Sequence, residues 1–232
     1  LSHEFDYEMQ RVFPKHAQNS LTIGVSTNVV TRWLAPRLGS FLNTGPKITL
    51  NLQHSVNEPD FSISQVDLAI RWGRGRWPDG ESELLIPLPM IALCSPDLLS
   101  NGRESSNPEE LLQYVTLHGA DGDDHWPLWM EAAGLNPERL RKGPMIVDPH
   151  VRIQSAIEGQ GFVIANHLCQ PEIESGRLIE PFNVRATGLG YYLVYDKTQA
   201  QSESFKLFRH WLLKQITSYK AELITSAQLN FD

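Results

Sequence analysis

The stretch LTIGVSTNVVTRWLAPRLGSFL, residues 21–42, sets the fold of the N-terminal half of this chain. Its first five residues are rich in apolar and β-branched side chains, as in a buried strand. Ser26, Thr27 and Asn28 follow, and residues of these types are preferred N-terminal caps of helices. Apolar side chains then recur at helical spacing, at Val30, Trp33, Leu34, Leu38, Phe41 and Leu42. The stretch therefore predicts a strand, a cap and a helix in that order.

The segments that follow predict more strands. Ile48, Leu50 and Leu52 alternate with polar residues, as in a half-buried strand, and residues 66–72 (VDLAIRW) predict a buried one. Residues 84–94 are apolar but contain two prolines, at 87 and 89, which favours an edge strand or one that crosses between two lobes.

The second half of the chain repeats this rhythm. Strands are predicted at residues 114–117, 145–147, 162–165 and 191–195. Helices are predicted at residues 125–133, 149–158, 168–175 and 202–219, with Trp126 and Trp129 in the core. Alternation of this kind predicts an α/β fold with mostly parallel sheets.

Composition and charge exclude several classes of function. The 232 residues are 41% hydrophobic and 20% charged, as in an ordinary folded protein. A net charge of −7 argues against a nucleic-acid surface, because neutralising phosphates needs clustered Lys and Arg. No apolar run approaches the roughly 20 residues that span a bilayer, and no secretory signal is recognisable, so a cytoplasmic protein without membrane contact is expected.

Catalytic and metal-binding motifs are missing from the sequence. It contains no G-x-S-x-G, HExxH or GxxxxGK[ST] pattern, so no enzyme is expected. The two cysteines, Cys94 and Cys169, have no metal-ligand spacing, and the acidic run at 121–125 lacks the spacing of a Ca²⁺ loop. Neither a metal nor a cofactor is expected.

Four motifs in one order carry a family resemblance: IGVS at 23–26, WLAPRL at 33–38, VDLAIRWG at 66–73 and CSPDLL at 94–99. From about residue 20 to the end, the chain resembles the effector-binding domain of LysR-type bacterial transcription regulators. The run RWGRGRWP at 71–78 and the helix with Trp126, Trp129, Ala132 and Gly134 resemble the subgroup containing regulators of glycine cleavage and of β-lactamase expression. Asn166-His167 departs from the family, which usually has Pro after the strand that ends at Ala165.

The resemblance implies two Rossmann-like lobes joined by crossing strands, as in periplasmic binding proteins. Residues 1–20 would be the end of a linker helix and a linker, residues 21–93 with 196–232 lobe I, and residues 94–195 lobe II. A homodimer or tetramer is implied, with the helix that starts near Thr31 against the partner's second lobe. Trp33, Leu34 and Phe41 are accordingly not expected all to point inward without help from another surface. DNA would be contacted only through a winged helix-turn-helix outside this chain.

Two strand-to-helix turns are candidate sites for a small ligand in the implied cleft. Helix N-termini there present unpaired N–H groups, which favour an anion. The first turn is Ser26, Thr27 and Asn28, which the residues alone favour as a plain cap and the resemblance favours as a binding site. The second is Asp148, Pro149 and His150, where His150 could cap the helix, be structural or meet a ligand.

Further candidate residues come from the neighbouring strands. Arg71, Trp72 and Trp77 combine cations and aromatic faces that suit an anionic or aromatic ligand, with a solvated loop as the alternative. Tyr192 could offer its hydroxyl to the cleft or belong to the core.

The leading hypothesis is a ligand-sensing domain of a transcription regulator, with a small polar or carboxylate effector in the interlobe cleft. The alternative is a periplasmic solute-binding protein of a transporter, since the two folds are alike.

Overall fold

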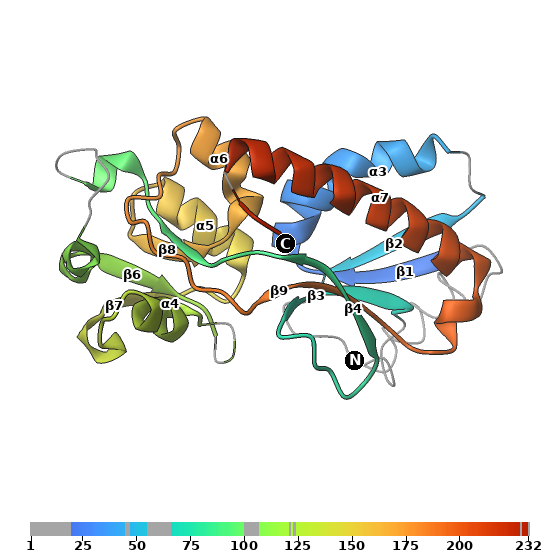
Figure 1. The fold of residues 1–232 in the computed structure, drawn as a ribbon, viewed down its shortest axis with the longest axis horizontal. Helices are drawn as coiled ribbons and strands as arrows, with labels where there is room; N and C mark the ends of the chain where they lie inside the picture. Colours follow the sequence, from blue (N-terminus) through green and yellow to red (C-terminus); the bar gives the residue numbers. More distant parts are fainter. Residues whose placement is uncertain are drawn as a thin grey trace, which may run out of the picture.

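The computed structural model describes residues 20–44, 47–54, 66–99, 107–120, 122, 124–227 and 229–231. These residues form two α/β lobes, each built on its own sheet (Figure 1). The linker helix expected before residue 20 lies outside the described residues.

Lobe I contains a five-stranded sheet in the order β2-β1-β3-β9-β4. Its strands are β1 (Ser20–Val25), β2 (Thr49–His54), β3 (Leu68–Gly73), β4 (Glu81–Pro87) and β9 (Gly190–Tyr195). Strand β1 runs parallel to β2 and β3, whereas β9 is antiparallel to β3 and β4. The long helix α7 (Glu203–Ser226) covers this lobe with an apolar stripe at helical spacing, which includes Phe205, Phe208, Leu212 and Ile216.

The helix after β1 runs without a break through three segments. These are α2 (Thr27–Val29), a π-helical turn at Val30–Leu34 and α3 (Ala35–Leu42). Trp33, Leu34 and Phe41 are all buried within a single chain, so the surface they need comes from the same chain rather than from a partner. This surface is α7, whose Tyr219 packs beside Trp33 and whose Phe208 packs edge-on to Phe41.

Lobe II contains a four-stranded sheet in the order β5-β8-β6-β7. Its strands are β5 (Ile91–Leu93), β6 (Val115–His118), β7 (Arg141–Met145) and β8 (Phe162–Ala165), and its helices are α4 (Trp126–Ala132), α5 (Pro149–Ile157) and α6 (Gln170–Glu174). Phe162 and Ile164 belong to one apolar core, and Val163 and Ala165 to another, because successive side chains point to opposite faces of the sheet. Trp126 and Trp129 are buried in the first core, as expected.

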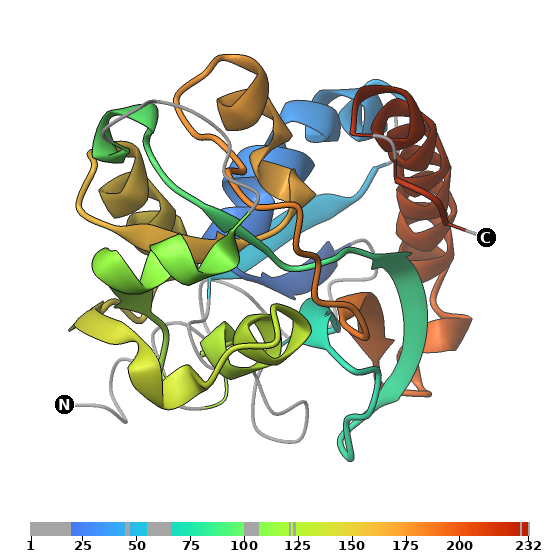
Figure 2. The same cartoon turned by 60° about the vertical axis from the view of Figure 1, so that its left-hand side comes forward.

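Two chain segments cross between the lobes, as the apolar run with its two prolines predicts (Figures 1 and 2). They run antiparallel, with backbone pairing of Met90 to Ala186 and of Cys94 to Ile179. Strand β5 belongs to the sheet of lobe II, and β9 belongs to the sheet of lobe I. The lobe boundaries expected after residues 93 and 195 therefore lie a few residues C-terminal to the crossing segments. The two-lobed α/β fold agrees with expectation. The sheets are mixed rather than mostly parallel, because β4, β5 and β9 pair antiparallel.

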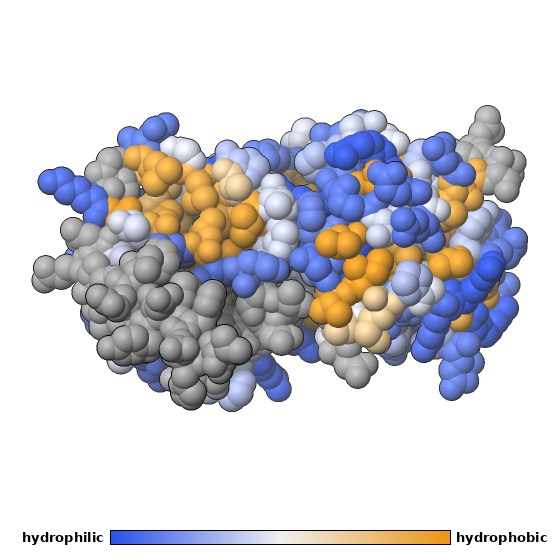
Figure 3. All heavy atoms as spheres, turned by 180° about the vertical axis from the view of Figure 1, so that it is seen from behind, coloured by the Kyte–Doolittle hydropathy of each residue, from blue (hydrophilic) through white to orange (hydrophobic). Residues whose placement is uncertain are grey.

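The surface opposite the view of Figure 1 shows apolar residues gathered in two areas with hydrophilic residues between them (Figure 3). The exposed large apolar side chains of the described residues include Leu42 and Leu52 in lobe I and Met145, Val147 and Val151 in lobe II. In the described part of the chain, no helix has the length and apolarity needed to cross a membrane.

Candidate functional site

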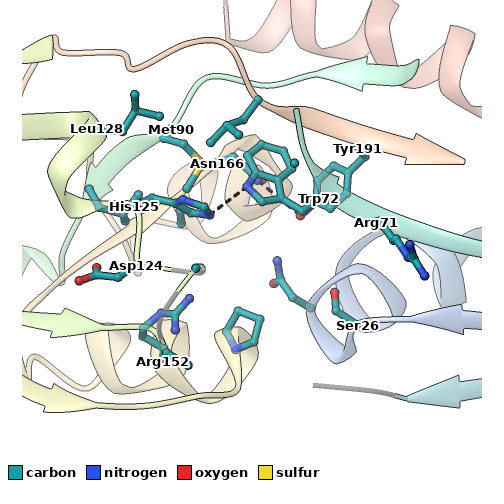
Figure 4. Close-up of a pocket in the computed structure, with 18 of the residues that line it drawn as sticks. Ser26, Arg71, Trp72, Met90, Asp124, His125, Leu128, Arg152, Asn166 and Tyr191 are labelled. Atoms are coloured by element: carbon teal, nitrogen blue, oxygen red, sulfur yellow. Dashed lines mark hydrogen bonds between the residues drawn. The ribbon is translucent and has the colours of Figure 1, made fainter. Parts of the chain in front are cut away.

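A cavity of about 1160 Å³ lies between the two lobes. Lobe I lines it with the carboxyl ends of β1 and β3 and the residues that follow them, which is where ligands bind in open α/β sheets. Lobe II lines it with the N-terminal ends of α4 and α5 and with the end of β8. Side chains from both lobes point into this space (Figure 4).

The turn after β1 presents Ser26 and Asn28 to the cavity. The hydroxyl of Ser26 accepts only a long hydrogen bond, 3.4 Å, from the backbone N–H of Val29. The side chain of Asn28 is buried, and its Oδ1 accepts a hydrogen bond of 3.0 Å from Nη1 of Arg32. Because a guanidinium only donates, this contact identifies the oxygen of the amide. The Nδ2 group of Asn28 has no acceptor among the described residues.

Arg32 joins the two lobes beside this turn. Its Nη2 lies 3.2 Å from Oε1 of Glu172 on α6, and the two side chains are 5% and 8% exposed. Its Nη1 also lies 2.6 Å from Nδ1 of His150 on α5. The orientation of Asn28 is therefore set by a cation that lobe II holds from the other side.

The second expected turn is satisfied by protein partners. Oδ1 of Asp148 accepts from the backbone N–H groups of His150, at 2.7 Å, and Val151, at 3.3 Å, so it caps α5. Nδ1 of His150 accepts from Arg32, which requires a neutral ring. Burial and the Arg32 charge lower the pKa of His150, while Asp148 and Glu172 act in the opposite direction. Of the three residues of this turn, Asp148, Pro149 and His150, only Pro149 lines the cavity directly.

Arg71 and its neighbours form a self-contained cluster. The Arg71 guanidinium makes two hydrogen bonds of 2.8 Å to the Asp79 carboxylate and lies over the ring of Trp77. Arg71 is buried rather than solvated, although part of it borders the cavity. Trp77 packs edge-on to Tyr192, and both lie outside the cavity. Neighbouring residues of β9 point to opposite faces, so Tyr191 takes the place expected of Tyr192 in the cavity wall.

Trp72 spans the space between the lobes. Its ring packs against Tyr191 of lobe I, with ring centroids 4.6 Å apart. Its Nε1 donates a hydrogen bond of 3.1 Å to Nε2 of His125, which precedes α4 in lobe II. Figure 4 shows this bond running across the cavity.

The structure therefore divides the expected site residues into two groups. Lining the cavity are Ser26, Asn28, Arg71 and Trp72. Outside its lining are Thr27, Trp77, Asp148, His150 and Tyr192. The hydroxyl of Thr27 is instead engaged by the ring of His54, 2.7 Å from Nδ1, and His54 itself lines the cavity.

Sequence reasoning missed Arg152, His125 and Asn166, which all line the cavity. Arg152 is buried on α5 and donates from Nη1 to the backbone oxygen of Ile146, at 2.7 Å. Its position three residues after Pro149 was the available signal, because residues at that spacing share a helix face. Asn166 directly follows β8, and its Nδ2 donates to the hydroxyl of Tyr191, at 3.4 Å.

Within the described ranges, no group of three His, Cys, Asp or Glu residues is arranged to hold a metal ion. Burial raises the pKa values of Cys94 and Cys169 to about 12, so both thiols stay protonated. Cys94 and Cys169 therefore supply no nucleophile to the site.

The chain is similar to one protein family and to several transcription regulators within it. The family model described as the LysR substrate binding domain matches residues 14–217. The glycine cleavage system transcriptional activator of Escherichia coli strain K12 is 35% identical over 201 residues, which are 86% of this chain and 66% of that protein. The HTH-type transcriptional regulator BlaA of Proteus vulgaris is 31% identical over 214 residues, 90% of this chain and 71% of that protein.

Solved structures agree with these matches. The effector domain of the transcriptional regulator AmpR of Pseudomonas aeruginosa is 28% identical and superposes with a TM-score of 0.77, covering 88% of this chain and 98% of that domain. The relatives are transcription regulators rather than enzymes or transport proteins. The match spans most of the chain and both lobes, and it shows that the chain belongs to the LysR family as the effector-binding domain of a transcription regulator.

Proposed function

We propose that the interlobe cavity binds a small polar effector with a carboxylate group, and that Asn28 is its main contact in lobe I. The observation that carries this proposal is the amide of Asn28. It is buried, it lines the cavity, and Arg32 holds its oxygen, which leaves its Nδ2 without an acceptor among the described residues. The Nδ2 group is not itself sealed from solvent, so it can donate to an acceptor oxygen of a ligand in the cavity, a hydrogen bond worth about 0.5–1.5 kcal/mol net.

The charge of the proposed effector rests on its surroundings. The continuous helix from Thr27 to Leu42 begins at this turn, and its N-terminal dipole favours an anion by about 0.3–1 kcal/mol, or up to about 2 kcal/mol when partly buried. Arg152 adds a buried guanidinium to the opposite wall. A carboxylate gains from both, whereas a neutral ligand gains less.

A ligand that touches both lobes favours one placement of the lobes over others. The regulatory consequence is a changed arrangement of the oligomer. The oligomer acts on DNA in the cytoplasm, through a DNA-binding domain outside these residues. The regulators that resemble this chain are longer: the chain spans 66% of the length of the glycine cleavage activator.

The oligomer is proposed to be a homodimer with antiparallel lobes. The exposed apolar side chains Leu42 and Leu52 of lobe I would face Met145 and Val151 of the partner's lobe II. Light scattering is expected to show a dimer at high protein concentration. A strict monomer would contradict this arrangement for the isolated domain.

The test of the effector site is Asn28→Leu, with Asn43→Leu on the exposed end of the same helix as the matched control. A ligand is first found by thermal-shift screening of amino acids, small carboxylates and cell-wall fragments. Calorimetry is expected to show at least tenfold weaker binding for Asn28→Leu and unchanged binding for the control. Stability should fall by about 1.5–3 kcal/mol, because the substitution removes the hydrogen bond that the Arg32 guanidinium donates to Oδ1 of Asn28. Unchanged affinity in Asn28→Leu would place the effector elsewhere, first of all at the loop from Arg71 to Trp77.

A further inference from the structure

One half of the cavity is apolar. Its side chains belong to a single apolar cluster of lobe II and the crossing segments: Trp72, Met90, Leu128, Leu135, Ile164 and Leu189. Trp72, Leu128 and Leu135 are only partly buried, so they present uncovered apolar surface to the cavity. Each would gain from contact with an apolar group of a ligand.

Polar groups lie on the other side of the Trp72–His125 hydrogen bond, although Asn166 lies with Met90 and Glu131 of α4 also lines the cavity. Figure 4 shows Leu128 and Met90 on one side of this bond, and Arg152 and Ser26 on the other. The cavity therefore has an apolar compartment and a polar compartment, separated by one interlobe contact.

The volume also exceeds what a small carboxylate can fill. Pockets of about 300–1,000 Å³ hold drug-sized ligands, and this cavity measures about 1160 Å³. A carboxylate bound near Asn28 and Arg152 would leave the apolar compartment uncovered.

We propose that the effector is an amphiphilic acid, whose carboxylate occupies the polar compartment and whose acyl or aryl arm occupies the apolar compartment against Trp72 and Leu128. This inference rests on the proposed effector site and adds the second half of the ligand. The arm passes the Trp72–His125 contact, so its binding displaces or reshapes a hydrogen bond that joins the lobes. The length of the arm then determines whether this contact between the lobes is kept or displaced.

The experiment uses a homologous series of probes, from N-acetylglycine to N-octanoylglycine, titrated into the 232-residue protein by calorimetry. Burying each added methylene is expected to strengthen binding three- to fourfold until the compartment is full. The heat-capacity change of binding should become more negative along the series, because apolar surface leaves water. N-octanoylglycinamide, which lacks the carboxylate, should bind more weakly than N-octanoylglycine.

The location of the arm is tested by Leu128→Gln, with Leu207→Gln on α7 as the matched control. Both positions are helical, and Leu207 is exposed and outside the cavity lining. The dependence on chain length is expected to flatten in Leu128→Gln and to persist in Leu207→Gln. A series that stays equally steep in both variants would place the arm elsewhere and overturn the inference.

The two proposals fail in different ways. Affinity that depends on the carboxylate but not on chain length would overturn the amphiphilic effector and leave the carboxylate site standing. Affinity that depends on chain length but is equal for acid and amide would overturn the carboxylate instead. If no member of the series binds, the amphiphilic effector is overturned, and the Asn28→Leu experiment decides the effector site separately.

Discussion

The two strand-to-helix turns that face each other across the lobes carry the same sequence signal but differ in the structure. After β1, Ser26 makes one long capping bond and the Asn28 amide keeps a free donor within the described part of the chain. Before α5, Asp148 makes two capping bonds and His150 accepts from Arg32. At the first turn a donor that faces the cavity has no protein acceptor among the described residues, whereas the polar groups of the second turn are engaged by the protein.

A cap sequence is therefore only a potential site. Whether it stays open depends on side chains from distant parts of the chain. Here Arg32 and Glu172 decide the outcome, because their ion pair holds the second turn against the first.

The largest effect is expected from Glu172→Leu, which leaves the buried Arg32 cation without its carboxylate. Removing one partner of a buried ion pair typically costs about 3–5 kcal/mol. Urea denaturation should show a loss of this size in the free energy of unfolding. The double variant Arg32→Met with Glu172→Leu should recover most of it, since no unpaired charge is left.

The matched control is Glu222→Leu, which breaks the Arg37–Glu222 pair. Glu222 is 60% exposed, and surface pairs of this kind contribute about 0–1 kcal/mol. Equal losses of unfolding free energy in Glu172→Leu and Glu222→Leu would mean that the interlobe pair contributes no more to stability than a surface pair does.

A smaller effect is expected from pH, through His167, whose short helix at His167–Cys169 packs against the helical segment Val30–Leu34 that follows the first turn. Burial, and then the charge of Arg185, lower the pKa of His167 from 6.5 to about 4. The unfolded chain therefore binds this proton at a higher pH than the folded one does. The contribution of His167 is complete above about pH 6.5 and is lost as the pH falls toward 4, in total about 3 kcal/mol.

Denaturation at a series of pH values measures this loss. His167→Leu should flatten the decline in stability between pH 6.5 and 4, whereas His210→Leu, at an exposed position of α7, should leave it unchanged. An equally steep decline in His167→Leu would assign the acid sensitivity to other groups.

Most of the fold was predictable because the apolar pattern is strong where the strands are buried. The strand at residues 162–165 has the bounds expected of it. The strand expected at 145–147 is instead β7 at Arg141–Met145, an exposed edge strand that contains Gly143 and Pro144. An edge strand needs no apolar alternation and tolerates proline, so this sequence gave no strand signal.

The site was less predictable, because its geometry depends on contacts between distant residues. Tyr191 rather than Tyr192 reaches the cavity, and in a strand buried on both faces the sequence pattern does not distinguish the two faces. Likewise, nothing local to Asp148 or His150 reveals that Arg32 approaches from 118 residues away. The candidate turns could be recognised in the sequence, but the protein contacts that engage one of them and not the other could not.

The smallest effect compares the caps themselves, Ser26→Ala with Asp148→Ala. Loss of a cap costs about 0.5–2 kcal/mol, and the cost should be larger at Asp148, whose two bonds measure 2.7 and 3.3 Å, than at Ser26, whose single bond measures 3.4 Å. Effector affinity should follow the opposite order, because Ser26 lines the cavity and Asp148 does not. Thermal denaturation and calorimetry on the same two variants measure both quantities. If the variant that loses more stability also loses more affinity, the distinction between an open and a closed turn is wrong, and the two caps act together as one structural unit.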